Sequence, residues 1–379
     1  MTVAATSELH EIRKRAADSF EAQGYPTKRN EEWKYTSVAA IVKADFPTAA
    51  PTLDRHSLRA AVEEHPGLIE EHLGHYANPD DNAFVALNTA HFQDGAFLHI
   101  PKNTVVDEPV WIDYAAASDR TTHSRNLIIV EANSQVRIVE RYRGKGRYFT
   151  NAVTEIVVGE NSVVEHVKLE EESEEAFHVA TIQAQLSPNS NFKSHNICFG
   201  GLLVRNDVNA VLATGSEGTL NGLYLTSGKQ HIDNHTMLDH AAPHAASHEL
   251  YKGILDGRSV CVFNGRVLVR KDAQKTDAKQ TNKNLVLSPG AMIYTKPELQ
   301  IFADDVRCTH GATVGQLDAD ALFYLRARGI GEIEARDLLI YAFARDVIDR
   351  IGVPEIHEYL EKALFDRLVF SREAGESVS

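Results

Sequence analysis

The segment ELQIFADDVRCTHGATVGQLD, residues 298–318, holds the sharpest grouping of residues that could do chemistry. If the chain is extended there, the side chains of Cys308 and His310 project from the same face, because strand residues two apart share a face. A thiolate beside an imidazole is a soft ligand pair suited to iron, zinc or copper. Two ligands do not close a metal site, so a site completed by a second subunit is the more economical hypothesis. A buried cysteine with a hydrogen-bonded histidine is the alternative.

The remaining cysteines and histidines give weaker signals. Cys198 and Cys261 have apolar neighbours, so we predict both to be core residues. Three cysteines cannot all pair within one chain, and no CxxC occurs, which opposes a disulfide framework or a zinc knuckle. The stretch 231–248 is rich in histidine, and its flanking Asp, Asn and Pro favour hydrogen-bonded histidines at chain turns over a metal-binding or proton-handling face.

Several other classes of function lack their sequence signature. The segment GLYLTSGKQ, residues 222–230, approaches a phosphate loop, but Gln230 stands where a Ser or Thr should bind magnesium, so we expect no nucleotide bound by this chain. Neither GxSxG nor HExxH occurs. A formal net charge of -14 opposes binding to nucleic acid or to an anionic membrane. With no long apolar run and no apolar leader, the sequence predicts a cytoplasmic protein.

An internal repeat shows which elements must position Cys308 and His310. Three fragments align with one another: IIVEANSQVRIVE (128–140), IVVGENSVVEHVK (156–168) and AQLSPNSNFKSHN (184–196). Their central serines, Ser134, Ser162 and Ser190, are 28 residues apart both times, and Ser216 follows after 26. Like apolar residues recur in columns: Ile128, Ile156, Ala184 and Ala210 in one, and Val136, Val164 and Phe192 in another. Such columns describe one inner face repeated at a constant period.

The period predicts the fold class. At ~3.3 Å per residue, about 28 residues supply roughly three short strands with corners, which is too little for a propeller blade. We therefore predict a mainly β protein, a parallel β-helix (solenoid) of about eight coils over residues 92–315. An antiparallel sandwich with accidental spacing is the alternative.

Helical periodicity flanks the β texture on both sides. We predict an N-terminal helical region over residues 1–91 and a C-terminal helical region over residues 316–379. One C-terminal helix carries a stripe that includes Leu338, Leu339, Phe343 and Val347. This stripe must be buried against the rod, another helix or another protein, and a simple end cap is the alternative to a docking face.

The run from SHELYKGILDG to LFYLRARGI, residues 247–330, resembles, almost end to end, the core of the SufB/SufD family of iron-sulfur cluster assembly proteins. The segment RNEEWKYTSV, residues 29–38, is similar to the SufD branch of this family. The motif DDVRCTHGATVGQLD also favours that branch, because SufB chains tend to be longer and to carry an EHEAT-type sequence where this chain has THGAT. The fold of the family, a β-helix between helical regions, agrees with the repeat.

The resemblance implies a scaffold subunit rather than an enzyme. Such a subunit pairs with SufB, binds the ABC-type ATPase SufC, and shares a transient iron-sulfur cluster with SufB. The motif histidine of the family, implicated in cluster formation at the SufB-SufD interface, falls on His310, and its neighbouring cysteine falls on Cys308. The family's C-terminal helices contact SufC, so the stripe of Leu338, Leu339, Phe343 and Val347 becomes the expected SufC-docking face.

The resemblance leaves alternatives open. A homodimer could compete with the SufB pairing, and the chain could be a purely structural scaffold without metal contact. A β-helix enzyme acting on polysaccharides is the rival from another class. Glycosidase chemistry needs a pair of carboxylates, and the adjacent Asp304 and Asp305 would face opposite ways on a strand.

Overall fold

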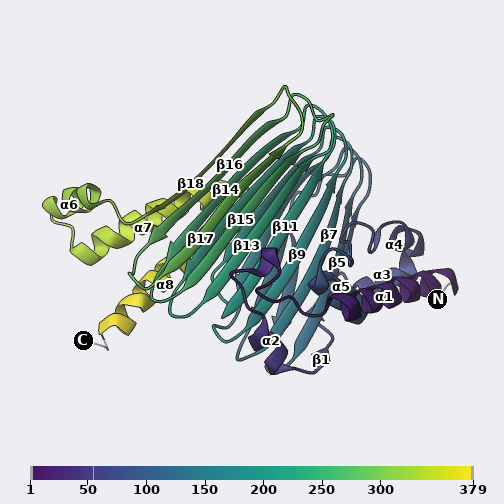
Figure 1. Ribbon diagram of the computed structural model, residues 1–379, viewed down its shortest axis with the longest axis horizontal. Helices are drawn as coiled ribbons and strands as arrows, with labels where there is room; N and C mark the ends of the chain where they lie inside the picture. The colour runs from purple at the N-terminus through teal and green to yellow at the C-terminus, as the bar shows by residue number, and fades with distance from the viewer. Residues whose placement is uncertain (1–2, 54, 377–379) are drawn as a thin grey trace.

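The protein is a parallel β-solenoid with helices packed on its outer faces (Figure 1). The computed structural model describes residues 3–53 and 55–376. Its strands alternate between two sheets, and from β3 to β16 each strand pairs in parallel with the strand two places later in the chain. About eight coils stack in this way, so the predicted fold class is confirmed.

The first sheet contains the odd-numbered strands. Along its length run β5 (Thr121–Val130), β7 (Phe149–Val158), β9 (Phe177–Leu186), β11 (Leu203–Leu212), β13 (His231–His240), β15 (Val260–Val269) and β17 (Met292–Ile301). The second sheet contains β4 (Val110–Ala116), β6 (Gln135–Gly144), β8 (Val163–Glu171), β10 (Asn191–Cys198), β12 (Glu217–Thr226), β14 (Ala246–Leu255), β16 (Asp277–Val286) and β18 (Arg307–Gly315). The short strands β1 (Thr48–Ala49), β2 (Thr52–Leu53) and β3 (Phe97–Ile100) extend the two sheets at their first coil.

The strand register reproduces the columns of the repeat. Ile128 pairs with Ile156, which pairs with Ala184, and Ala184 pairs with Ala210. These residues are buried in one apolar cluster between the sheets. The prediction of about three short strands per coil is wrong, because most coils have two strands of eight to ten residues joined by tight corners. A 28-residue period fixes the length of a coil but not the number of corners in it.

The recurring serines belong to these corners. Asn133, Asn161 and Asn189 each adopt a positive φ, near +58°, directly before the serine. Asparagine tolerates this left-handed conformation better than most residues. The buried hydroxyl of Ser162 donates to the carbonyl of Glu131 at 2.7 Å and accepts from the backbone N–H of Ser134 at 3.0 Å. The serine therefore ties one corner to the corner of the preceding coil.

Helices cover the outer face of the first sheet near its start (Figure 1). The elements before the solenoid are α1 (Val3–Gln23), the 3-10 helix η1 (Glu31–Trp33), α2 (Ala39–Ala44), α3 (Leu58–Glu64), α4 (Pro66–His72) and α5 (Ala83–His91). Trp33 and Phe84 pack against Phe149 and Phe177 of the sheet. Burial of these aromatic rings helps to hold this region on the sheet.

Two of the three C-terminal helices lie on the opposite side, against the outer face of the second sheet. The three are α6 (Ala319–Ala327), α7 (Glu332–Ile348) and α8 (Pro354–Glu376). Ile340 and Val347 of α7 and Leu360 of α8 join one buried cluster with the outward-facing residues of the sheet, such as Val167 and Leu223. α7 and α8 therefore pack along the side of the rod and do not cap its end, whereas α6 contacts α7 and has no buried residue.

Helices precede Phe97, strands continue to Gly315, and helices follow from Ala319. The division into units at 1–91, 92–315 and 316–379 stays a prediction, and residues 1–2, 54 and 377–379 lie outside the described residues. Within the described part of the chain, no helix combines the length and apolar character needed to cross a membrane.

An ionic network fastens η1 to the outer face of the first sheet. The carboxylate of Glu32 lies 3.2 Å from His235 Nδ1 and 2.9 Å from Arg266 Nη2, and it accepts from Asn264 Nδ2 at 3.1 Å. The hydrogen bond from His235 is the main cause that lowers the pKa of Glu32 to about 2. Burial and Arg205 lower the pKa of His235, but the carboxylates around it, including Glu32, raise it overall.

Replacing Glu32 by Gln should loosen this attachment in a pH-dependent way. The pKa of Glu32 is depressed in the folded protein, so its contribution is present above pH ~4.5 and is lost as the pH falls towards 2. The side chain is 45% exposed, and solvent screening limits the expected loss at neutral pH to about 1 kcal/mol. Chemical denaturation at several pH values should show a wild-type excess that shrinks below pH ~4.5 and disappears as the pH approaches 2.

Glu31→Gln is the matched control, because Glu31 is more exposed and lies 3.7 Å from Lys296. Limited proteolysis at Lys28 and Lys34 should speed up in Glu32→Gln and not in Glu31→Gln. Equal behaviour of the two variants would show that the network does not hold this segment.

Candidate functional site at the open end

The last coil of the solenoid carries Cys308 and His310. Both lie on β18, which pairs with β16 along one edge, so that Cys308 is opposite Ala278 and His310 is opposite Gln280. Within the described residues, no strand pairs with the other edge of β18, nor with the other edge of β17 in the first sheet. We call this part of the molecule, made of β17 and β18, the open end (Figure 1).

The two side chains belong to the inward-facing row of β18. Their partners on β16, Ala278 and Gln280, are buried inside the rod, and parallel register partners face the same way. Because no further coil of this chain covers them, Cys308 is half-buried and packs against the core, whereas His310 is exposed. The structure therefore places both on the last layer of the lumen, facing the open end.

The electrostatics of the site do not activate the thiol. Burial, and then the charge of Asp277, raise the pKa of Cys308, and the backbone N–H of Ala278 lowers it only in part. A thiol becomes a good nucleophile or ligand when its pKa is lowered. Across residues 3–53 and 55–376, no three His, Cys, Asp or Glu side chains are grouped to hold a metal ion. By themselves, Cys308 and His310 are therefore too few to form a metal site, and His310 is the more accessible of the two.

The open end also exposes apolar side chains next to its unpaired backbone. They are Met292 and Ile301 of β17, Phe302 directly after it, and Val314 of β18. Unpaired strand edges with exposed apolar residues favour association with another chain. This geometry suits the edge of a second solenoid or sheet.

The four residues of the predicted docking stripe on α7 differ in their exposure. Leu338 is exposed, Leu339 and Phe343 are half-buried, and Val347 is fully buried against the second sheet. The Nζ of Lys252 on β14 lies 4.5 Å above the Phe343 ring. A helical stripe alone does not reveal which of its members the rod covers.

Sequence reasoning missed the exposed apolar surface next to Leu338. Phe323 and Tyr324 of α6 and Ile333 of α7 are exposed, with Phe323 at 74%. None of the residues of α6 is buried. The sequence contained one sign of this surface: the segment ADALFYL has apolar residues on more than one side of a short helix, so they cannot all be buried against one neighbour.

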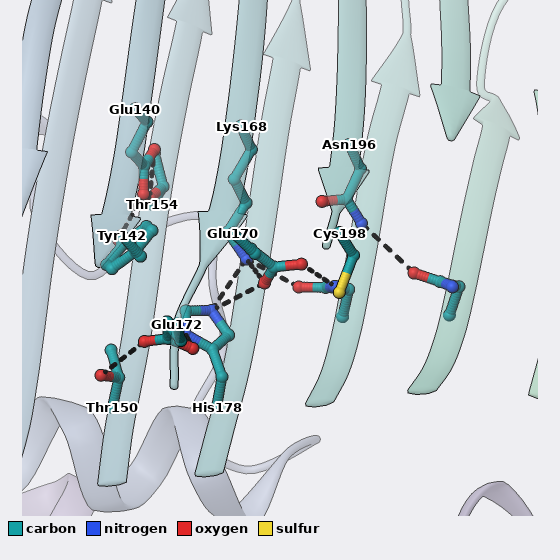
Figure 2. A network of polar contacts seen from close by, with 12 residues as sticks. Glu140, Tyr142, Thr150, Thr154, Lys168, Glu170, Glu172, His178, Asn196 and Cys198 are labelled. Atoms are coloured by element: carbon teal, nitrogen blue, oxygen red, sulfur yellow. Dashed lines mark hydrogen bonds and ion pairs between the residues drawn. The ribbon is translucent and has the colours of Figure 1, made fainter. Parts of the chain in front are cut away.

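A buried polar network inside the rod was also missed. Figure 2 shows Lys168, Glu170 and His178 pointing toward one another between the sheets. Lys168 Nζ donates to Glu170 Oε1 and to Asn206 Oδ1, both at 2.7 Å, and His178 Nε2 lies 3.0 Å from Glu170 Oε1. Burial raises the pKa of the neighbouring Cys198 thiol far above its usual range. Cys198 and Cys261 are both buried, so the prediction that they are core residues is confirmed.

The histidine-rich stretch serves several separate contacts. His231 lies 2.9 Å from Thr36 Oγ1, and His235 bridges Asp233 and Glu32, so both fasten the N-terminal segment. His240 is buried and lies 2.8 Å from Ser247 Oγ. These three histidines all lie on β13, and they make separate contacts at different positions along this one strand.

A two-sheet parallel solenoid with helices packed on both outer faces and an open last coil defines a class of β-solenoid scaffold. Residues 113–343 match the family described as "SUF system FeS cluster assembly, SufBD core domain". Residues 1–56 and 51–112 match the SufBD protein N-terminal region.

Individual relatives agree with these family matches. The chain is 33% identical to an iron-sulfur cluster assembly SufBD family protein of Synechocystis, over 94% of this chain and 90% of the relative. It is 28% identical to the iron-sulfur cluster assembly protein SufD of Escherichia coli over 86% of each chain. It is also 28% identical to SufD of Bacillus subtilis, over 79% of this chain and 70% of that one. The protein belongs to the SufBD family of iron-sulfur cluster assembly proteins.

The raised pKa of Cys308 leads to a test of thiol reactivity. With iodoacetamide at neutral pH, Cys308 of the folded chain should react several-fold more slowly than free cysteine, because less of it is thiolate. Cys198 and Cys261 should react only after unfolding, because both are buried. Mass spectrometry of the peptides measures all three rates, and Cys308→Ser serves as the control. A rate for Cys308 above that of free cysteine would contradict this account of the site.

Proposed function

We propose that this chain is a non-ATPase scaffold subunit of a Suf-type assembly complex, and that its open end pairs with a SufB-type subunit. Membership in the family supports a role in iron-sulfur cluster assembly. The observation that carries the pairing is the pair of unpaired edges on β17 and β18 with exposed apolar side chains beside them. A second solenoid would continue both ladders and cover the last layer of the lumen.

In this proposal the nascent cluster is cargo, assembled at the joint. His310 offers an imidazole there, and Cys308 lies two residues away on the same row. Imidazole and thiolate are both suitable ligands for iron. Because the described residues contain no complete ligand set, the SufB-type partner supplies the other ligands.

The same proposal gives the C-terminal helices a second partner, a SufC-type ATPase. We place the docking face on the exposed surface of Phe323, Ile333 and Leu338. Val347 is excluded from that face because it is fully buried against the second sheet. ATP-driven movement of such a partner would act on α7 and, through it, on the joint.

A second candidate function is a scaffold that shapes the joint without donating a ligand. The raised pKa of Cys308 favours it, since binding iron as a thiolate would require the loss of a proton that this environment retains. In that case the chain contributes only the strand edges and the ATPase-docking helices.

Co-expression with a SufB-type and a SufC-type protein separates the two candidates. His310→Ala should lower the cluster yield, measured by visible absorbance and iron content, by about tenfold, as the loss of a ligand predicts. Thr309→Ala is the matched control, because Thr309 is exposed on the neighbouring position of β18. If the cluster yield is unchanged in His310→Ala and the complex is intact, His310 is not a ligand, and the second candidate function is supported.

The docking face has its own test. Leu338→Asp should abolish co-purification of the SufC-type protein without unfolding the chain, because Leu338 is 43% exposed. Val42→Asp on α2 is the control of matched exposure, at 45%, on the N-terminal side of the rod. Retained co-purification of Leu338→Asp with a stable fold would move the docking face elsewhere.

A further inference from the structure

A column of inward-facing residues in the second sheet leads to His310. In successive strands Leu220 pairs with Glu249, Glu249 with Gln280, and Gln280 with His310. Leu220, Glu249 and Gln280 are buried. His310 is therefore the last member of a row whose preceding members lie inside the rod.

Glu249 fixes the orientation of the Gln280 amide. The carboxylate of Glu249 accepts from Thr236 Oγ1 at 2.5 Å and from Gln280 Nε2 at 2.7 Å. Burial raises the pKa of Glu249 to about 7, and above that pH its ionised carboxylate can only accept hydrogen bonds, so the amide turns its NH₂ group toward Glu249. The carbonyl oxygen of Gln280 takes no part in this contact with Glu249.

Gln280 is confined at this place by the opposite wall of the lumen. A Cβ at Gly265 of β15 would lie only 2.3 Å from Gln280 Nε2, so the amide occupies the space that the glycine leaves. Gln280 is 1% exposed. A confined side chain of this kind presents its polar atoms in a defined direction.

The carbonyl oxygen of Gln280 has no hydrogen-bond partner within the described residues. Buried acceptors are almost always paired, so an unpaired one needs an explanation. The next residue along the ladder is His310, whose strand lies ~4.8 Å away. Within the described residues no hydrogen bond joins the two side chains, so a contact between them requires the exposed imidazole to turn toward the lumen. Imidazole carries one N–H in its neutral form and can satisfy this oxygen.

We propose that Gln280 is a positioning residue for His310: its carbonyl oxygen accepts one imidazole N–H, which leaves the other ring nitrogen facing the joint as an acceptor. The inference rests on the proposed function, because it assigns His310 the role of a ligand at the open end. A ligating histidine usually donates its second N–H to such an acceptor, which fixes the tautomer and the ring orientation. Glu249 supports the arrangement one coil deeper, by holding the amide in the required orientation.

Three variants of the full-length chain test this role. Gln280→Met removes the acceptor and keeps a similar shape. Glu249→Gln keeps shape but allows the Gln280 amide to turn either way, since the new amide can both donate and accept. Lys279→Met is the matched control, because Lys279 precedes Gln280 on β16 and is exposed on its outer face.

The first measurement is the tautomer of His310 in chain labelled with ¹⁵N-histidine, its signals assigned by their loss in His310→Gln. We expect one predominant tautomer in the wild type and in Lys279→Met, and a mixture in Gln280→Met and Glu249→Gln. If Gln280 only stabilised the fold, its replacement would not change the tautomer of His310. An unchanged tautomer in both test variants would overturn the proposal.

The second measurement is cluster yield in co-expression with SufB-type and SufC-type partners. Gln280→Met should lower the yield by about tenfold and Glu249→Gln by a smaller factor, with partner co-purification and melting temperature retained. If His310→Ala lowers the yield but neither test variant does, the positioning role is wrong and the proposed function stands. If His310→Ala does not change the cluster yield, His310 is not a ligand. The tautomer measurement then decides separately whether Gln280 contacts His310. If Gln280→Met does not fold, the tautomer and cluster yield of Glu249→Gln, which keeps the same side-chain volume, test the positioning role of Gln280.

Discussion

Backbone hydrogen bonding between successive coils is the interaction on which the rest of this structure depends. In a parallel solenoid each strand satisfies its N–H and C=O groups with the coil before and the coil after, so a ladder must begin and end somewhere. At its start β1 and β3 pair with β5, and β2 pairs with β4. At the other end the chain turns into α6, which has no buried residue, and the edges of β17 and β18 are left unpaired. The open end is therefore a direct consequence of where the repeat stops.

The same ladder stacks polar residues as strictly as apolar ones. Glu140, Lys168 and Asn196 are register partners on β6, β8 and β10, and all three are buried. Buried charges are tolerated only when they are paired and hydrogen-bonded. Lys168 meets this condition through Glu170 and Asn206. The lumen is thus polar along part of its length, and its residues adopt a limited set of orientations because each faces fixed neighbours in the adjacent coils.

The sequence was sufficient to predict the fold class, because a constant period leaves few ways to bury the same column of Ile128, Ile156 and Ala184. It could not predict the number of strands per coil, which depends on how tight the corners are. Nor could it predict the exposure of His310, which depends on β18 being the last strand. The contact of Glu249 with Gln280 was out of reach because the steps from Glu249 to Gln280 and from Gln280 to His310 are 31 and 30 residues, and not 28.

The attachment of α7 determines how the proposed joint could respond to a partner. The helix packs against the outer face of the second sheet, and Lys252 Nζ of β14 lies 2.8 Å from Asp346 Oδ2 of α7. A force on α7 therefore enters the sheet at β14, two strands before β18. Strands joined by a continuous ladder move together more readily than they separate, so such a force tilts the last coil as a unit. Because His310 stands on that coil, a small tilt would change the geometry of the proposed shared site without unfolding either chain.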